Sequence, residues 1–343
     1  MKVSKTKGGS FAAGKVTEGC ELCIEGRKLV LFVTGLCNQN CYYCSISQGR
    51  WQKDEVWANE RRVEKPEDII EEAKLCGAKG AGITGGEPLM VVDRVCDYIR
   101  LLKKEFGKGF HIHMYTNGTL ATDDVLRKLN EAGLDELRIH LDRTAVERAL
   151  KLAGWKVGME VPCIPGKEKE LCGLVDFLAA TGAHFLNLNE LEFSERNVEP
   201  MLKLGLTLKA DSLTAVRGSD RTALAVLQHA LGKRLPAHFC TARLKLDCQL
   251  RNRLINRASN VKRPFEKVTP DGFLLKGVME GDGAEAELKR LGVKEFFLNR
   301  ERGRAEFSAD IAKRIAKKAK LRVAIVEEYP TANPWDFELT PLN

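Results

Sequence analysis

Strand-like and helix-like segments alternate regularly along residues 29–188 of this 343-residue chain. The strands are short apolar runs rich in β-branched residues, and the helices are longer amphipathic stretches bounded by Pro, Thr or Gly. The expected strands are 29–35, 79–84, 110–115, 136–141, 157–164 and 184–188, and the expected helices are 66–76, 91–106, 122–133, 144–153 and 167–181. Repeated β–α units imply a parallel sheet with right-handed crossovers, so the fold class is α/β.

Three cysteines, Cys37, Cys41 and Cys44, follow the first expected strand with C-x3-C-x2-C spacing. A cubane of four irons normally takes four thiolates, so three thiolates leave one iron free to bind another ligand. Half a zinc site and three unrelated buried thiols are the alternatives. Zinc sites more often combine two separated C-x2-C pairs. The spacing therefore favours an iron–sulfur cluster in a redox enzyme.

The second expected strand runs directly into Gly85, Gly86, Glu87 and Pro88. Paired glycines let a ligand approach the backbone closely, and a carboxylate such as that of Glu87 can accept hydrogen bonds from an ammonium group. A second ligand-binding loop is therefore expected beside the cysteines.

Together these motifs resemble those of the radical S-adenosylmethionine (SAM) superfamily, with Tyr43 as the aromatic residue before the third cysteine. The resemblance covers roughly residues 29–190 and implies a partial (β/α)6 barrel. It also implies that Cys37, Cys41 and Cys44 bind a [4Fe–4S] cluster, and that the Gly-Gly-Glu-Pro motif binds the amine of SAM. More narrowly, the chain is similar to an archaeal group described as related to pyruvate formate-lyase activating enzymes, which names no substrate.

Polar residues follow the later expected strands, where such barrels carry their chemistry. In the superfamily these strand ends contact the ribose, carboxylate and adenine of SAM. The cofactor-binding candidates are Asn117, His140, Asp142 and Asn189, and further candidates at the strand ends are Pro162, Gly166, Asn187 and Glu190. The alternative is that some of them only cap helices or strands.

Residues 45–62 form a long polar stretch after the cysteines that contains Trp51 and Trp57. Loops of this length in compact domains are often functional. We expect either a lid that keeps water from the radical or a packed surface loop.

A further pair, Cys20 and Cys23, has the form of half a metal knuckle. His238 and Cys240 are its best complement, with Cys248 as an additional thiol. These residues predict a second site for zinc or an auxiliary cluster, although no second C-x2-C pair fixes the pairing.

Residues 233–267 carry ten Lys or Arg against two acidic residues, a surplus of +8 that equals the net charge of the whole chain. Such a stripe is the electrostatic footprint of nucleic acid binding. The alternative is an amphipathic helix whose basic face is simply solvated. The predicted phosphate-binding residues are Arg243, Lys245, Arg251, Arg253 and Arg257.

Four segments are expected: an N-terminal extension with the possible knuckle, a barrel, a basic helical linker, and a small C-terminal α+β module. Their bounds are 1–28, 29–232, 233–262 and 263–343. The N-terminus lacks the apolar core of a signal peptide, and no apolar run approaches the roughly 20 residues of a membrane span. We therefore expect a cytoplasmic enzyme without a membrane partner.

The resemblance implies that ferredoxin or flavodoxin supplies an electron for the reductive cleavage of SAM, and that the resulting radical abstracts a hydrogen atom. The basic segment favours a macromolecular substrate, RNA and most plausibly tRNA. The alternative is a protein or peptide, as for a glycyl-radical activase. A third reading is a non-catalytic iron–sulfur protein for RNA binding or electron transfer, which would not need the Gly-Gly-Glu-Pro motif.

Overall fold

The structure, a computed structural model, describes residues 2–343. It divides the chain into two compact units, one comprising the residues up to Lys74 with Ala78–Leu250, and the other Leu75–Gly77 with Arg251–Asn343. The division falls within the segment 233–262, which the sequence presented as a linker.

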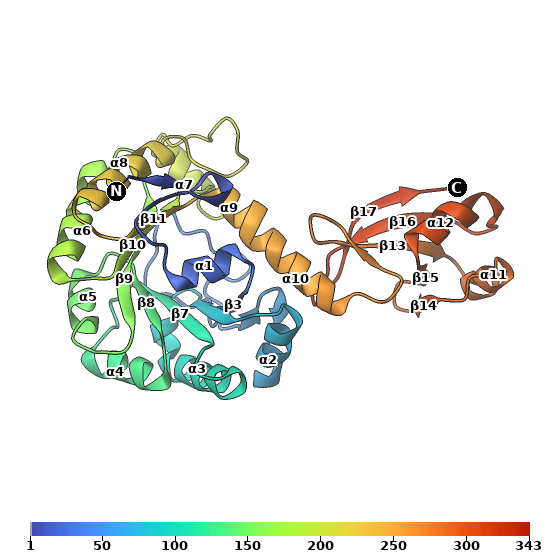
Figure 1. Cartoon of the computed structure of the whole chain (residues 1–343), viewed down its shortest axis with the longest axis horizontal. Helices are drawn as coiled ribbons and strands as arrows, with labels where there is room; N and C mark the ends of the chain where they lie inside the picture. The colour runs from blue at the N-terminus through green and yellow to red at the C-terminus, as the bar shows by residue number, and fades with distance from the viewer. Residues whose placement is uncertain (1) are drawn as a thin grey trace. The chain divides into compact units, whose positions relative to one another are not determined.

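The first unit is built on a curved sheet that contains the six expected parallel strands (Figure 1). In chain order they are β3 (Lys28–Phe32), β6 (Gly80–Thr84), β7 (His111–Thr116), β8 (Glu136–Ile139), β9 (Lys156–Cys163) and β10 (Phe185–Glu190). Each overlaps its expected range. The partial (β/α)6 barrel is therefore confirmed.

Short strands extend this sheet at both edges. β11 (Ala237–Cys240) runs parallel to β10, and β2 (Phe11–Ala13) and β1 (Ser4–Lys5) follow in antiparallel orientation. At the other edge, β4 (Trp57–Ala58) and β5 (Arg61–Arg62) form a hairpin beside β3. The predicted helical linker is thus wrong at 237–240. This four-residue strand escaped notice because basic helical segments surround it.

Helices cover the outer face of the sheet, as Figure 1 shows. They are α2 (Pro66–Leu75), α3 (Val92–Phe106), α4 (Asp123–Ala132), α5 (Arg143–Ala149), α6 (Glu168–Thr181) and α8 (Ser219–Gly232). Glycines in left-handed backbone end two of them, with φ of 99° at Gly133 and 75° at Gly182. No helix within residues 2–343 is both long and apolar enough to cross a membrane.

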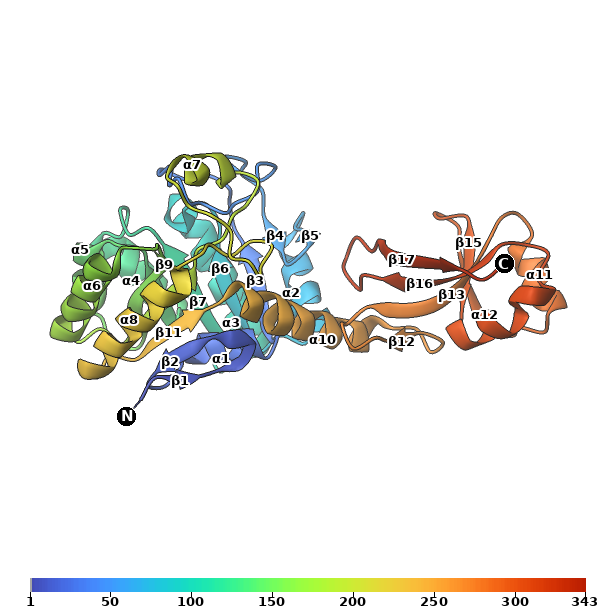
Figure 2. The same ribbon diagram turned by 90° about the horizontal axis from the view of Figure 1, so that it is seen from above.

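Two short helices lie at opposite ends of the barrel (Figure 2). α7 (Val198–Lys203) follows β10, at the end where the parallel strands finish. α1 (Glu18–Ile24) packs on β3, β6 and β7 from inside the barrel. The N-terminal extension is therefore part of the barrel unit, because β2 pairs with β11 and α1 fills one end of the interior.

The inner face of the sheet is polar. On β7 and β8, Ile112, Met114 and Leu137 are fully buried among the apolar core residues, whereas the alternating positions His113 and Arg138 line an interior cavity. Successive strand residues point to opposite faces. The barrel therefore packs its apolar core between sheet and helices and keeps a polar chamber inside.

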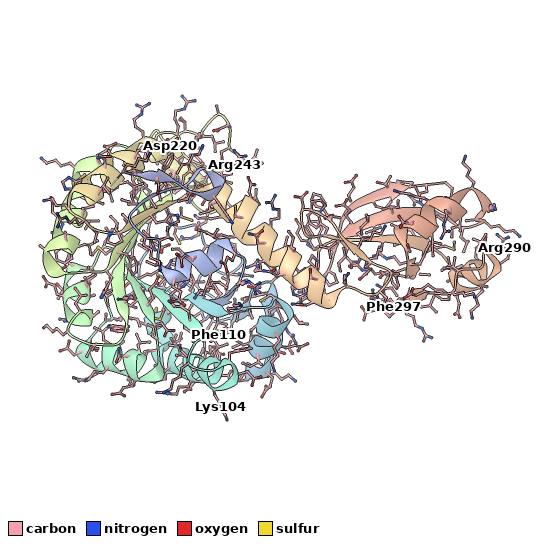
Figure 3. The ribbon with its side chains drawn as sticks, in the orientation of Figure 1. Lys104, Phe110, Asp220, Arg243, Arg290 and Phe297 are labelled. Atoms are coloured by element: carbon pink, nitrogen blue, oxygen red, sulfur yellow. The ribbon has the colours of Figure 1, made fainter. Side chains whose placement is uncertain are left out.

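The second unit is a small α+β module, as expected. It begins with α10 (Arg251–Val261), and its antiparallel sheet has the order β14-β15-β13-β16-β17, with β12 beside β13. Its strands are β12 (Lys267–Val268), β13 (Leu274–Glu280), β14 (Phe296–Asn299), β15 (Arg304–Phe307), β16 (Val323–Glu328) and β17 (Asp336–Pro341), and its further helices are α11 (Ala284–Arg290) and α12 (Ala309–Ile315). Figure 3 labels Arg290 on α11 and Phe297 on β14.

Candidate active site

All three cysteines of the triplet line a cavity of about 350 Å³ at the end of the barrel where the parallel strands finish. Cys37, Cys41 and Cys44 are half-buried there, in the loop that follows β3. Tyr43, Gly85, Gly86, Pro88, Asn117, His140 and Asn189 line the same cavity. The fold therefore brings most of the predicted cofactor-binding residues together.

The glycine motif is packed directly against the strand end that precedes the cysteines. The Gly86 amide donates to Thr34 O at 2.8 Å, and the Glu87 amide donates to Leu36 O at 2.7 Å. A Cβ on Gly85 would lie 2.4 Å from Thr34 O, and one on Gly86 would lie 2.2 Å from Leu36 O. Only glycine permits this approach, so the motif fixes the start of the cysteine loop.

The carboxylate of Glu87 faces protein donors and does not line the cavity. It is fully buried and accepts hydrogen bonds from Leu89 N at 2.9 Å, Thr116 Oγ1 at 2.7 Å and Asn117 N at 2.6 Å. Burial raises the pKa of Glu87, although these three donors oppose the shift. In the structure Glu87 holds the end of β7 in place, whereas the sequence suggested contact with an ammonium group.

Tyr43 and His140 join the cysteine loop to β8. The Tyr43 hydroxyl lies 2.7 Å from His140 Nε2, and His140 Nδ1 lies 3.2 Å from Glu160 O. Burial lowers the pKa of His140, which favours the neutral ring. Asp142, two residues further on, instead caps α5 by accepting from Ala145 N at 2.9 Å. The structure therefore gives Asp142 a capping role outside the cavity.

A buried ion pair forms the cavity wall beyond His140. Arg138 donates to Glu160 Oε2 at 2.8 Å, and Asn189 donates to Glu160 Oε1 at 2.8 Å. Burial alone would raise the pKa of Glu160, but the Arg138 charge and the amide donors lower it. Arg138 and Glu160 are therefore both charged.

The stretch 45–62 contributes Ser45, Ile46 and Trp51 to the cavity lining. The Arg196 guanidinium lies 3.6 Å from the centre of the Trp51 ring and donates to Asn40 Oδ1 at 2.6 Å. Gln52 Nε2 donates to Cys37 O at 2.9 Å. The Gln52 bond ties the stretch to the cysteine loop, and the Trp51 contact ties it to Arg196; both contacts fit a lid and a packed surface loop equally.

A second cavity of about 480 Å³ lies deeper in the barrel, and Cys20, Cys23, His238 and Cys240 all line it. Cys248 is not among its lining residues. Burial raises the pKa of Cys23 and of Cys240 to about 12, so these thiols are neutral as they stand. The residues shared with the first cavity are Ser45, Thr84, Tyr115, Arg138, Glu160, Asn189 and Lys245. Of the further strand-end candidates, Pro162 and Glu190 line the first cavity and Asn187 the second.

Lys28, which lines the second cavity, makes a buried contact with His111, with 2.8 Å between Lys28 Nζ and His111 Nδ1. Burial, followed by the Lys28 charge, lowers the pKa of His111 to about 3. The other charged groups around this imidazole are Lys103, Asp135, Glu136 and Arg138. His111 is therefore neutral in the folded protein.

The five predicted phosphate-binding residues are divided between the two units and differ in burial and partners. Lys245 lines both cavities and donates to Glu192 Oε1 at 2.5 Å. Arg257 is buried and donates to the carbonyl of Pro330. Arg243 on α9 (Ala242–Leu244) is exposed but paired with Asp247 at 2.9 Å (Figure 3). Arg251 is exposed and Arg253 half-buried. The burial of Arg257 contradicts its predicted place on a phosphate-binding surface, and the phosphate-binding role of the other four residues stays a prediction.

The sequence reading missed several residues of the site: Gln52, Tyr115, Arg138, Glu160, Glu192 and Asn197. Asn197 donates to Tyr43 O at 3.0 Å and to Glu192 O at 2.9 Å, so it joins the cysteine loop to the segment after β10. Arg138 and Glu160 are charged residues within otherwise apolar strands. That pattern could have indicated from the sequence that both side chains point into the barrel.

Comparison with known proteins places this site in a family. The model described as Radical SAM superfamily matches residues 31–160. A protein of Methanocaldococcus jannaschii is 40% identical over 359 residues, which covers 96% of this chain and 93% of that protein. The chain belongs to the radical SAM superfamily, and it is an enzyme of that class with a [4Fe–4S] cluster and SAM as cofactors. The name of the M. jannaschii protein proposes a glycyl-radical enzyme activating enzyme.

Other similarities cover less of the chain. The GTP 3′,8-cyclase of Lactiplantibacillus plantarum is 30% identical over 184 residues, 48% of this chain and 53% of the cyclase. The crystal structure of Streptococcus suis SuiB bound to the precursor peptide SuiA has a TM-score of 0.46 at 15% identity, covering 65% of this chain and 51% of SuiB. The C-terminal residues 272–342 match a domain of unknown function, DUF8061.

Proposed function

We propose that this radical SAM enzyme removes a hydrogen atom from a partner protein, as a glycyl-radical activating enzyme does. The observation that carries the proposal is the 40% identity to the M. jannaschii protein, which extends over 96% of this chain and therefore includes both units. The matches to the GTP 3′,8-cyclase and to SuiB cover less of the chain and do not bear on the substrate.

The residues at the barrel mouth fit the cofactors of the family. Cys37, Cys41 and Cys44 would hold the cluster, and the backbone around Gly85 and Gly86 offers a surface without side chains beside them. When bound, the cluster and SAM supply reductive cleavage to methionine and a 5′-deoxyadenosyl radical that abstracts hydrogen. We propose ferredoxin or flavodoxin as the electron donor.

The remaining residues of the site orient and shield. The Tyr43–His140 contact and the Asn197 bonds hold the cysteine loop, and the Trp51–Arg196 pair covers it. Excluding water protects a reactive intermediate from side reactions. A partner protein would have to present its glycine at this covered mouth.

The test uses reconstituted enzyme, SAM, a reductant and an anaerobic cell extract divided by ultrafiltration into proteins and metabolites. We expect the protein fraction to stimulate formation of 5′-deoxyadenosine above the basal rate and to acquire a glycyl-radical signal in electron paramagnetic resonance. A protein fraction from cells fed α-deuterated glycine should transfer deuterium to 5′-deoxyadenosine.

Two treatments of the protein fraction, together with the metabolite fraction, decide among the substrate classes. Protease should abolish the stimulation, whereas ribonuclease should leave it intact. Stimulation that survives protease but not ribonuclease would instead support RNA, and stimulation by the metabolite fraction would support a small molecule. Either outcome would overturn the protein-substrate proposal.

A further inference from the structure

The second cavity brings together residues that are far apart in the sequence. They are a pair of cysteines from the N-terminal segment and a His-x-Cys pair from β11. α1 begins at the Thr17 cap, which accepts from Cys20 N at 3.4 Å, and one helical turn then places Cys20 and Cys23 on the same side. β11 contributes His238 and Cys240, which are two residues apart and so share one face of the strand. All four line the cavity of about 480 Å³.

α1 is seated closely against the polar wall of the barrel. A Cβ on Gly19 would lie 2.6 Å from an Arg138 nitrogen and 2.9 Å from His113 Nδ1. A larger residue at position 19 would push the helix away. The position of the two α1 thiols is thus fixed by tight packing.

His238 gives an independent sign of a missing ligand. Its side chain is only 2% exposed, and among residues 2–343 neither of its ring nitrogens has a hydrogen-bond partner. A buried polar group left without a partner costs about 1 to 3 kcal/mol, so native proteins rarely leave one unsatisfied. Coordination to a bound group would satisfy one of these nitrogens.

Hydrogen-bond donors and two cations face the sulfur atoms, and the Glu160 carboxylate in the same cavity is already paired with Arg138. Arg138 donates to Cys20 Sγ at 3.4 Å, and Asn187 donates to the same sulfur at 3.5 Å. Gln249 donates to Cys240 Sγ at 3.5 Å, and Lys245 lines the same cavity. Hydrogen bonds to sulfur are among the interactions by which proteins tune iron–sulfur clusters.

We propose that Cys20, Cys23 and Cys240 hold a second iron–sulfur cluster inside the barrel, with His238 as its fourth ligand. In the described part of the chain, no three His, Cys, Asp or Glu side chains are close enough to hold a single metal ion. This also applies to Cys37, Cys41 and Cys44, the cysteines of the family cluster. A zinc ion needs sulfur atoms about 2.3 Å from one centre, whereas a cluster spreads its ligands over several irons. Three thiols, two of which accept hydrogen bonds at sulfur, favour a cluster over zinc.

The test measures iron, acid-labile sulfide and zinc per chain after anaerobic reconstitution, with Mössbauer and electron paramagnetic resonance spectra as readouts independent of activity. The variant C37A/C41A/C44A should retain one cluster and lose SAM cleavage. The variant C20A/C23A should also retain one cluster, and the combined variant should hold none. Cys96→Ala is the matched control, because Cys96 is buried in α3 and lies outside both cavities.

His238→Gln should keep the iron but alter the spectrum of the second cluster, which a purely structural histidine would not do. A triple variant C37A/C41A/C44A that binds no iron, or that binds zinc in place of iron, overturns the proposal even if C20A/C23A fails to fold. The outcome is independent of the substrate, since no partner protein is present in the assay.

Discussion

Replacing Glu87 by Gln separates two roles for the Gly-Gly-Glu-Pro motif: contact with the SAM amine, or support of the barrel wall. Two donors converge on Glu87 Oε1 and one on Oε2. A carboxamide has only one oxygen, so its NH2 group must face the amide of either Asn117 or Leu89. Thr116 Oγ1 can reverse its hydrogen bond, and one backbone N–H is therefore left unpaired in either orientation.

An unpaired buried donor costs about 1 to 3 kcal/mol. For a unit of this size that corresponds to a decrease in Tm of about 2 to 12 °C, from roughly 2 to 4 °C per kcal/mol. We expect this loss in the cofactor-free protein, where SAM plays no part. The assay is anaerobic thermal and denaturant unfolding of wild type, E87Q and the control E147Q, whose residue is exposed on α5.

A direct contact with the SAM ammonium predicts the opposite pattern. Losing a hydrogen bond to a charged group would weaken SAM binding roughly 10- to 150-fold, from about 1.5 to 3 kcal/mol, and leave stability unchanged. SAM affinity is measured on reconstituted protein by equilibrium dialysis. Wild-type stability in E87Q together with SAM binding weakened more than tenfold would refute the supporting role derived from the structure.

Three further variants test other contacts. Tyr43→Phe removes the 2.7 Å contact with His140. A lost hydrogen bond of about 0.5 to 1.5 kcal/mol should slow SAM cleavage by up to about tenfold and leave the iron content unchanged. Loss of the cluster in this variant would contradict the expectation. The pKa of His111 is lowered to about 3 in the folded protein, whereas in the unfolded chain it is near 6.5. Between these two values the unfolded chain therefore binds one proton more at this residue. The free energy of unfolding should fall by up to about 1.4 kcal/mol per pH unit as the pH is lowered from 6.5 toward 3. Denaturant unfolding across that range should show a shallower dependence in His111→Gln, and an equal slope would contradict the assignment. Arg257→Gln should destabilise the protein by about 1 to 3 kcal/mol without changing its affinity for tRNA. The control Arg251→Gln, at an exposed residue, should leave stability intact. Loss of tRNA binding in Arg257→Gln at full stability would support the phosphate-binding interpretation of Arg257.

Local patterns in the sequence predicted the parts of the fold that local physics determines. The six parallel strands and the cysteine loop after β3 follow from apolar runs, turn residues and spacing over a few residues. Asp142 shows the limit of such patterns. A short carboxylate after a strand suits both a ligand and a helix cap, and only the Ala145 amide at 2.9 Å decides between them.

Long-range neighbours could not be predicted in the same way. That Arg138 pairs with Glu160 depends on the register of β8 and β9, and that Arg257 is buried against Pro330 depends on the packing of the second unit. The basic segment is uniformly basic in sequence, yet its side chains lie in different surroundings. Lys245 lines a cavity, Arg257 is buried and Arg251 is exposed. Net charge along a chain carries no information about which face each charge will occupy.

The polar interior of the barrel connects the cysteine loop at one end with α1 at the other. Burying Arg138 and Lys28, and Glu160 to 10% side-chain exposure, costs free energy that an apolar filling would avoid, and even paired buried charges are weak contributors to stability. The bonds that Arg138 and Asn189 donate to Glu160 hold its charge in a fixed position in this chamber. α1 fills one end (Figure 2), and Trp51 lines the cavity at the other end together with the three cysteines. Radical chemistry requires that the radical encounter its substrate before water, and in the proposed reaction a polar chamber with fixed charges beside the cysteine loop serves this requirement.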